Sequence, residues 1–193
     1  MPRPAPLRMD ADSFLDWAED QEGRYELAGG EVVAMAPERA VNARTKGRAF
    51  RILGDEVQRA GLPCEVFPDG MAVRVDDDTV YEPDASVRCG DPLDPNATEF
   101  SDPVVLVEVT SPSTSRVDVG MKLSDYFRLP SVRHYLILRV DRRTAIHHAR
   151  DDAGAIATRI LTEGTITLDP PGLVIDFDAV FGEVAANPPR TSH

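Results

Sequence analysis

The run Val104-Val105-Leu106-Val107-Glu108-Val109-Thr110 is the clearest guide to the fold, because here an apolar run of the length of a strand meets a single acid. Apolar, β-branched runs of this length predict a buried strand. A carboxylate at the end of such a strand is costly unless it has a partner. Spacing alone leaves two roles open for Glu108. It belongs to a functional site, or it caps the turn at residues 110–114 or meets an arginine.

The segments on both sides of this run predict an α/β (α+β) domain. Short extended runs between Asp-, Gly- and Pro-rich turns predict strands at 64–67, 71–75, 81–87 and 103–109, which are expected to form one central sheet, and later strands at 133–140, 144–149, 155–161 and 173–175. Apolar residues at helical spacing predict helices at 12–20, 38–60 and 115–129. The pair Gly29-Gly30 separates two extended runs and predicts an N-terminal hairpin.

A chain of 193 residues is expected to form one domain, here residues 10–184, with flexible ends at 1–9 and 185–193. Its longest apolar runs are far shorter than the roughly 20 residues that span a bilayer, and its first residues lack the apolar stretch of an export signal. A cytoplasmic protein without a membrane partner is therefore expected. In that compartment Cys64 and Cys89 are expected to be reduced thiols with packing roles.

Asp84 is a second acid where a central strand meets a polar turn. Pro83 before it suits a strand start or an edge, and turn formation alone explains most Pro-Asp pairs. If Asp84 and Glu108 converge, they repel each other unless a cation lies between them, and oxygen ligands suit Mg²⁺ or Mn²⁺ better than Zn²⁺. Histidine ligands for zinc are not expected, because His147 and His148 are adjacent and His134 has no partner at ligand spacing.

Lysine is scarce, since Lys46 and Lys122 are the two lysines among 21 basic residues. In a chain whose other basic residues are arginines, a lysine indicates a need for a compact charge that can donate a hydrogen bond to a phosphate or a water. The alternative for Lys122 is a helical ion pair with Asp118, four residues earlier.

The net charge is −12, which opposes non-specific attraction to nucleic acid unless a basic patch is local. Such a patch is predicted on or beside the first long helix, with Arg39, Asn42, Arg44 and Lys46 as candidate nucleic-acid contacts. The alternative for each basic residue is a solvated helix face.

Several of these residues together resemble a known family. Pro83-Asp84, the run from Val107 to Thr114, and the following Asp118, Lys122 and Tyr126 resemble the Uma family of restriction-endonuclease-like proteins, in the PD-(D/E)XK nuclease superfamily. The resemblance extends from about Tyr25 to Leu173. It implies a mixed central sheet flanked by helices, with Asp84 and Glu108 holding Mg²⁺ or Mn²⁺ and a lysine assisting the attacking water.

The chain departs from the superfamily pattern at two positions. Thr110 stands two residues after Glu108, where the pattern has a lysine, and the resemblance implies that Lys122 replaces it from the next helix. Asn42 stands where similar proteins have a histidine. Glu26 resembles an additional early acid that binds metal or orients a water. From the residues alone, Glu26 projects to solvent or pairs across the hairpin.

The resemblance implies a Mg²⁺-dependent endodeoxyribonuclease that acts on DNA, with a homodimer expected for cutting both strands. Two alternatives stay open: a non-catalytic interaction or oligomerisation domain on the same scaffold, and a hydrolase of small phosphorylated metabolites, which suits the acidic net charge.

Overall fold

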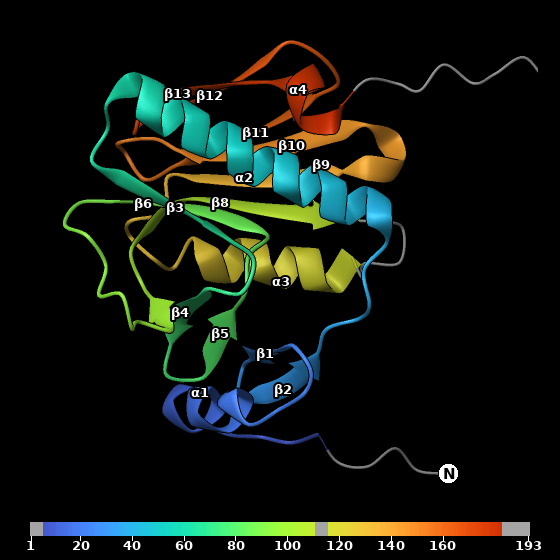
Figure 1. The fold of residues 1–193 in the computed structure, drawn as a ribbon, viewed down its shortest axis with the longest axis vertical. Coiled ribbons are helices and arrows are strands. Elements are labelled where there is room, and N and C mark those ends of the chain that lie inside the picture. The colour runs from blue at the N-terminus through green and yellow to red at the C-terminus, as the bar shows by residue number, and fades with distance from the viewer. Residues whose placement is uncertain (1–5, 111–115, 183–193) are drawn as a thin grey trace, which may run out of the picture.

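The computed structural model describes residues 6–110 and 116–182, with no side chain described at 116–119. Its core is a six-stranded mixed sheet beside a smaller five-stranded one (Figure 1). The larger sheet contains, in spatial order, β11 (Ile156–Leu161), β10 (Thr144–Arg150), β9 (His134–Arg139), β8 (Pro103–Thr110), β6 (Ala85–Cys89) and β3 (Cys64–Pro68). The smaller sheet contains β2 (Glu31–Ala34), β1 (Tyr25–Ala28), β5 (Thr79–Tyr81), β4 (Ala72–Asp76) and β7 (Glu99–Phe100).

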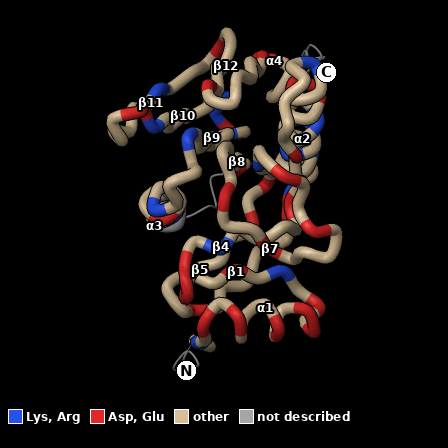
Figure 2. Tube along the Cα trace, turned by 90° about the vertical axis from the view of Figure 1, so that its left-hand side faces the viewer, with Lys and Arg blue, Asp and Glu red and all other residues tan. Residues whose placement is uncertain are grey.

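Two long helices, α2 (Ala40–Ala60) and α3 (Arg116–Tyr126), cover the two faces of the larger sheet. The described residues also form α1 (Ala11–Glu19), α4 (Phe177–Phe181) and a separate hairpin of β12 (Thr165–Leu168) and β13 (Leu173–Asp176). The helices α2 and α3 lie on opposite sides of β8, and α1 packs under the smaller sheet (Figures 1 and 2). No helix within residues 6–110 and 116–182 is long and apolar enough to cross a membrane.

This arrangement explains why β8 is apolar in consecutive positions rather than in alternate ones. Val105 and Val107 pack in the cluster that contains Leu53 of α2, while Leu106 packs in the cluster that contains Tyr126 of α3. A strand covered on both faces reads as a continuous apolar run. The same alternation turns Glu108 toward the side of Leu106 and α3.

The N-terminal hairpin forms as predicted. Gly29 and Gly30 both have positive φ angles, 55° and 78°, as a two-residue hairpin turn requires. Leu7 and Met9 fall in the segment expected to be flexible, yet they exchange backbone hydrogen bonds of 2.9 and 3.0 Å with Val32 and Gly30. The rest of the segments expected to be flexible, 1–5 and 185–193, lie outside the described residues.

The prediction of one central sheet is wrong for the segments 71–75 and 81–87. The first forms β4 of the smaller sheet. The second is shared between the two sheets. That segment divides, because β5 ends at Tyr81 in the smaller sheet and β6 begins at Ala85 in the larger one. Pro83 lies between them, and proline has no N–H to continue a ladder. Asp84 therefore lies where the chain crosses between the two sheets.

Two further expectations are corrected by strand pairing. Cys64 lies directly opposite Cys89 in the β3–β6 ladder, and the two form a disulfide rather than separate thiols. His134 of β9 has a partner after all, since its Nδ1 lies 2.9 Å from Nε2 of His147 on β10. The strands β7 and β12 and the helix α4 were not predicted.

Candidate active site

Asp84 and Glu108 are brought together where β6 begins beside the end of β8. Ala85, the first residue of β6, is paired with Val107, and the N–H of the preceding Asp84 donates to the carbonyl of Val107 at 2.9 Å. Asp84 therefore lies next to the end of β8 that carries Glu108 and Val109. Both carboxylates are buried, at 5% and 9% exposure, and both line one cavity of about 760 Å³.

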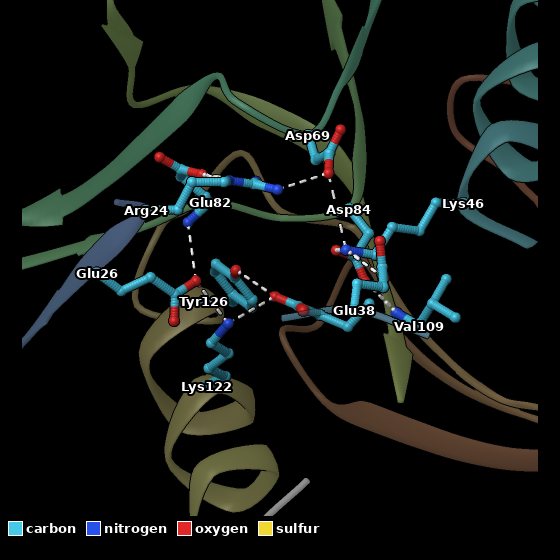
Figure 3. Close-up of polar contacts among 11 residues, drawn as sticks. Arg24, Glu26, Glu38, Lys46, Asp69, Glu82, Asp84, Val109, Lys122 and Tyr126 are labelled. Atoms are coloured by element: carbon cyan, nitrogen blue, oxygen red, sulfur yellow. Dashed lines mark hydrogen bonds and ion pairs between the residues drawn. The ribbon is translucent and has the colours of Figure 1, made fainter. Parts of the chain in front are cut away.

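Asp84 is held by a backbone amide and a lysine (Figure 3). Its Oδ2 accepts from the N–H of Val109 at 2.5 Å, and its Oδ1 lies 2.6 Å from Nζ of Lys46. Burial, and after it the negative charge of Glu108, raise the pKa of Asp84 to about 7 although Lys46 opposes the shift. The protonated form of Asp84 is therefore favoured first by burial and then by the neighbouring carboxylate.

Glu108 is held by two residues one turn apart on α3. Its Oε1 accepts from Nζ of Lys122 at 3.0 Å and from the hydroxyl of Tyr126 at 2.8 Å. Residues at i and i+4 share a helix face, so Lys122 and Tyr126 reach the same oxygen. The sequence left two other roles open for Glu108, capping of the turn at 110–114 and contact with an arginine. That turn lies mostly outside the described residues. The observed partners of Glu108 are a lysine and a tyrosine rather than an arginine.

Lys122 is buried between two acids. Its Nζ donates to Oε1 of Glu26 at 2.8 Å, and the same oxygen accepts from the N–H of Glu82 at 3.0 Å (Figure 3). Burial opposes its charge, but Glu108 and Glu26 together hold the pKa of Lys122 well above its ordinary value. Lys122 is therefore a fixed ammonium that donates hydrogen bonds and does not accept protons at neutral pH.

Glu26 does not project to solvent or pair across the hairpin. It is 8% exposed and points from β1 toward α3. Burial raises its pKa, opposed by Lys122 and reinforced by Glu108. Its contacts make it a positioning acid for Lys122.

Thr110 lines the same cavity as Glu108, as expected from strand alternation. It brings no charge there, whereas the ammonium of Lys122 contacts Glu108 directly. The alternative partner of Lys122, Asp118, has a side chain outside the described part of the chain.

The predicted nucleic-acid contacts divide into two groups. Arg39, Asn42 and Lys46 line the cavity, whereas Arg44 lies exposed on α2 and does not. Lys46 is not a free surface cation, because Glu38 at 2.7 Å, Asp84 at 2.6 Å and Asp69 at 3.7 Å surround its Nζ. Burial opposes its charge, but Asp84 and Glu38 raise its pKa.

Two charged residues of the cavity wall, Arg24 and Glu38, were not identified from the sequence. Glu38 precedes α2 by two residues and binds Lys46 at 2.7 Å. Arg24 binds Asp69 at 2.7 Å and Glu82 at 2.6 Å, which are 45 and 58 positions away in the chain. At such separations the arginine and its two acids form no local pattern, so no sequence signal could have joined them.

The donor set at Asp84 and Glu108 fits Mg²⁺ or Mn²⁺. Within residues 6–110 and 116–182 there is no group of three or more His, Cys, Asp or Glu residues arranged to hold a metal. Mg²⁺ is commonly held by one or two carboxylates and completes its shell with water and substrate phosphate. Burial is the first cause of the raised pKa of Asp84, and the negative charge of Glu108 is the second; a divalent cation between the two carboxylates would relieve the second.

The chain is similar to known proteins over most of its length. Residues 11–180 match the family model Uma2, described as "Putative restriction endonuclease". The uncharacterized protein slr1290 of Synechocystis sp. is 25% identical over 181 residues, which cover 92% of this chain and 94% of that protein. The crystal structure of a "putative nuclease belonging to DUF820" from Anabaena variabilis has a TM-score of 0.74 and 16% identity, and the match covers 92% of this chain and 98% of that one. This likeness confirms the expected fold class.

Proposed function

Because the chain belongs to the Uma2 family, described as putative restriction endonucleases, we propose that it is a nuclease that hydrolyses DNA phosphodiester bonds with Mg²⁺ or Mn²⁺. One observation carries the proposal. Two buried carboxylates, Asp84 just before β6 and Glu108 near the end of β8, share a cavity with the buried ammonium of Lys122.

Asp84 and Glu108 would hold the cation. When bound there, a divalent cation supplies charge neutralisation on the phosphate and a lower pKa for a bound water. Tyr126 orients Glu108 by donating to Oε1, and the N–H of Val109 orients Asp84 by donating to Oδ2. Both carboxylates are thus fixed before substrate arrives, which is the form of preorganisation that lowers a barrier.

Lys122 would stabilise negative charge rather than remove a proton. Its pKa is held well above the ordinary value, so it carries its proton throughout a cycle at neutral pH. Its three donors exceed its two carboxylate contacts, which leaves one hydrogen for a phosphate oxygen or for the attacking water. Glu26 keeps the ammonium in that position.

DNA would reach the cavity across the start of α2. Arg39 and Asn42 line the cavity there, and Arg44 is exposed on α2 outside the cavity. Cutting both strands would take a second copy of the chain, so a homodimer working in the cytoplasm is part of the proposal.

A cleavage assay with matched carboxylate variants tests the proposal. With Mn²⁺, wild type is expected to nick plasmid and to cut single-stranded DNA, leaving 5′-phosphates, and Mn²⁺ is expected to raise the melting temperature by several degrees. Asp84→Asn and Glu108→Gln should abolish cleavage and the melting shift. Asp55→Asn is the control, because Asp55 is an exposed acid on α2 paired with Arg51.

The alternatives predict different results. Hydrolysis of a small phosphodiester without any cleavage of DNA would favour a metabolite hydrolase, which the net charge of −12 suits. Absence of cleavage together with an equal Mn²⁺ shift in wild type and Asp84→Asn would contradict both enzymatic functions and favour an interaction domain.

A further inference from the structure

Lys46 forms an ion pair with Asp84, the carboxylate that would bind the proposed metal. Its Nζ lies 2.6 Å from Oδ1 of Asp84, and its side chain is only 13% exposed. The other oxygen, Oδ2, is already bound by the N–H of Val109 at 2.5 Å. Oδ1, the oxygen of Asp84 that accepts no hydrogen bond from the backbone, is therefore the one that the ammonium of Lys46 contacts.

The ammonium and a divalent cation cannot share that oxygen at low cost. A Mg²⁺ ion about 2.1 Å from Oδ1 would lie less than about 5 Å from Nζ in its present position. Three positive charges would then meet in a buried site, where repulsion is screened weakly. One of the two cations has to leave when the other binds.

Lys46 has other acceptors to which it can move. Glu38 already lies 2.7 Å from its Nζ, and Asp69 lies 3.7 Å away, with side chains 28% and 33% exposed compared with 5% for Asp84. Asn42 lies one turn earlier on the same helix face, and its buried Oδ1 has no hydrogen-bond partner in the described part of the chain. A flexible lysine stem can thus leave Asp84 and keep an acceptor.

We propose that Lys46 is an exchangeable counter-ion of the metal site: it neutralises Asp84 in the metal-free protein and moves to Glu38 and its neighbours when a divalent cation binds. The inference rests on the proposed metal site at Asp84 and Glu108. It assigns Lys46 to metal exchange in place of a standing contact with DNA. The apparent affinity for metal is then reduced by the fraction of molecules in which Lys46 covers Asp84.

Metal titrations of charge variants test this exchange. Lys46→Met removes the ammonium and keeps the length of the side chain, so Mn²⁺ should bind about tenfold tighter or more, as measured by calorimetry or by electron paramagnetic resonance. Lys46→Arg keeps a cation beside Asp84 and should bind no tighter than wild type. Without metal, Lys46→Met should melt at a lower temperature than wild type, because Asp84 is left buried without its counter-charge.

Two controls separate exchange from general electrostatics. Arg51→Met removes one charge from the same helix at an exposed position and should change Mn²⁺ affinity less than about twofold. Asp84→Asn should abolish binding in wild type and in the Lys46→Met background. Asp84-dependent binding that is unchanged or weaker in Lys46→Met would overturn the exchange and leave the metal site intact. Absence of binding in both wild type and Lys46→Met would overturn the metal site as well.

Because the chain has two lysines, the movement of the Lys46 ammonium can be followed by NMR. Protein labelled with ¹⁵N at lysine Nζ contains two side-chain ammonium groups, Lys46 and Lys122, and Lys46→Arg assigns the two signals. Titration with diamagnetic Mg²⁺ should shift the Lys46 signal by much more than it shifts the Lys122 signal, which keeps Glu26 as a partner. A Lys46 signal that stays in place while Mg²⁺ saturates an Asp84-dependent site would contradict the proposal.

Discussion

Lys122 shows how one residue acquires its chemistry from two distant acids. Glu26 is 96 positions away in the chain and Glu108 is 14 positions away, yet both lie within 3.0 Å of the same Nζ. The ammonium is fixed in charge and in position, which suits a donor to a phosphate or to a water. The planar guanidinium of an arginine at this position is larger than an ammonium. It would not fit between Glu26 and Glu108 while both carboxylates stay within 3.0 Å of the donor.

Lys122→Arg is expected to lower turnover on DNA by about a hundredfold or more, because the bulkier guanidinium would displace the attacking water or the phosphate from its reacting position. Lys122→Met should also lower the free energy of unfolding by about 3–5 kcal/mol, since it leaves Glu26 and Glu108 buried without a counter-charge. Steady-state cleavage rates and urea unfolding curves measure the two effects. Arg51→Met, at an exposed ion pair, should cost about 1 kcal/mol or less. Full activity in Lys122→Arg would remove Lys122 from the reaction.

Among the structural elements, the β9–β10 hairpin carries a buried pair of imidazoles. Nε2 of His134 lies 2.9 Å from the carbonyl of Pro170, so this nitrogen carries the proton and donates. The neutral ring of His134 then accepts at Nδ1 from Nε2 of His147, at 2.9 Å. Burial lowers the pKa of His134, and burial with the neighbouring charges of His134, Arg159 and His148 lowers the pKa of His147 to about 4.

The pair makes the hairpin sensitive to acid. The folded pKa of His147 lies below its unfolded value, so its contribution to stability is full above the unfolded pKa of about 6.5 and is lost as the pH falls toward 4. His147→Asn should therefore lose fewer degrees of melting temperature than wild type between pH 7 and pH 5. His148→Asn is the comparison, because His148 has a threonine hydroxyl as its partner. Parallel melting curves for wild type and His147→Asn would contradict this account.

At the scale of the whole molecule, the net charge of −12 is unevenly distributed. Acidic positions follow one another along α1, at the end of the molecule away from α4 (Figure 2). The cavity opens instead between the hairpin, the start of α2 and the ends of β6 and β8. The start of α2 carries two exposed arginines, Arg39 at the rim of the cavity and Arg44 outside it, which remain the predicted contacts for phosphate.

The double variant Arg39→Gln and Arg44→Gln is expected to weaken DNA binding about tenfold at low salt and to reduce the slope of log K against log salt by about 2, since each phosphate contact releases about one counter-ion. Binding is measured in the Glu108→Gln background, which prevents cleavage. Arg51→Gln, farther along α2, should change neither quantity. An unchanged slope in the double variant would exclude these two arginines from phosphate contact.

Most of the local elements, and the motif, could be predicted from the amino-acid sequence alone. The run before Glu108 predicted β8, Gly29-Gly30 predicted the hairpin turn, and helical spacing ending at Gly61 predicted α2. These features depend on side-chain periodicity and backbone preference within a few residues, which a sequence displays directly. The resemblance at Asp84, Glu108 and Lys122 also came from the sequence.

Which distant groups meet depends on tertiary packing. The pairing of β6 with β8 brought Asp84 beside the end of β8, α2 brought Lys46 onto Asp84, and the packing of β1 near α3 gave Lys122 its second acid. The division of residues 81–87 between two sheets was likewise invisible in the local pattern. The partner of a charged residue cannot be predicted from spacing in the sequence. Coulomb attraction depends on distance in space and on burial, and both are set by the packing of segments far apart in the chain.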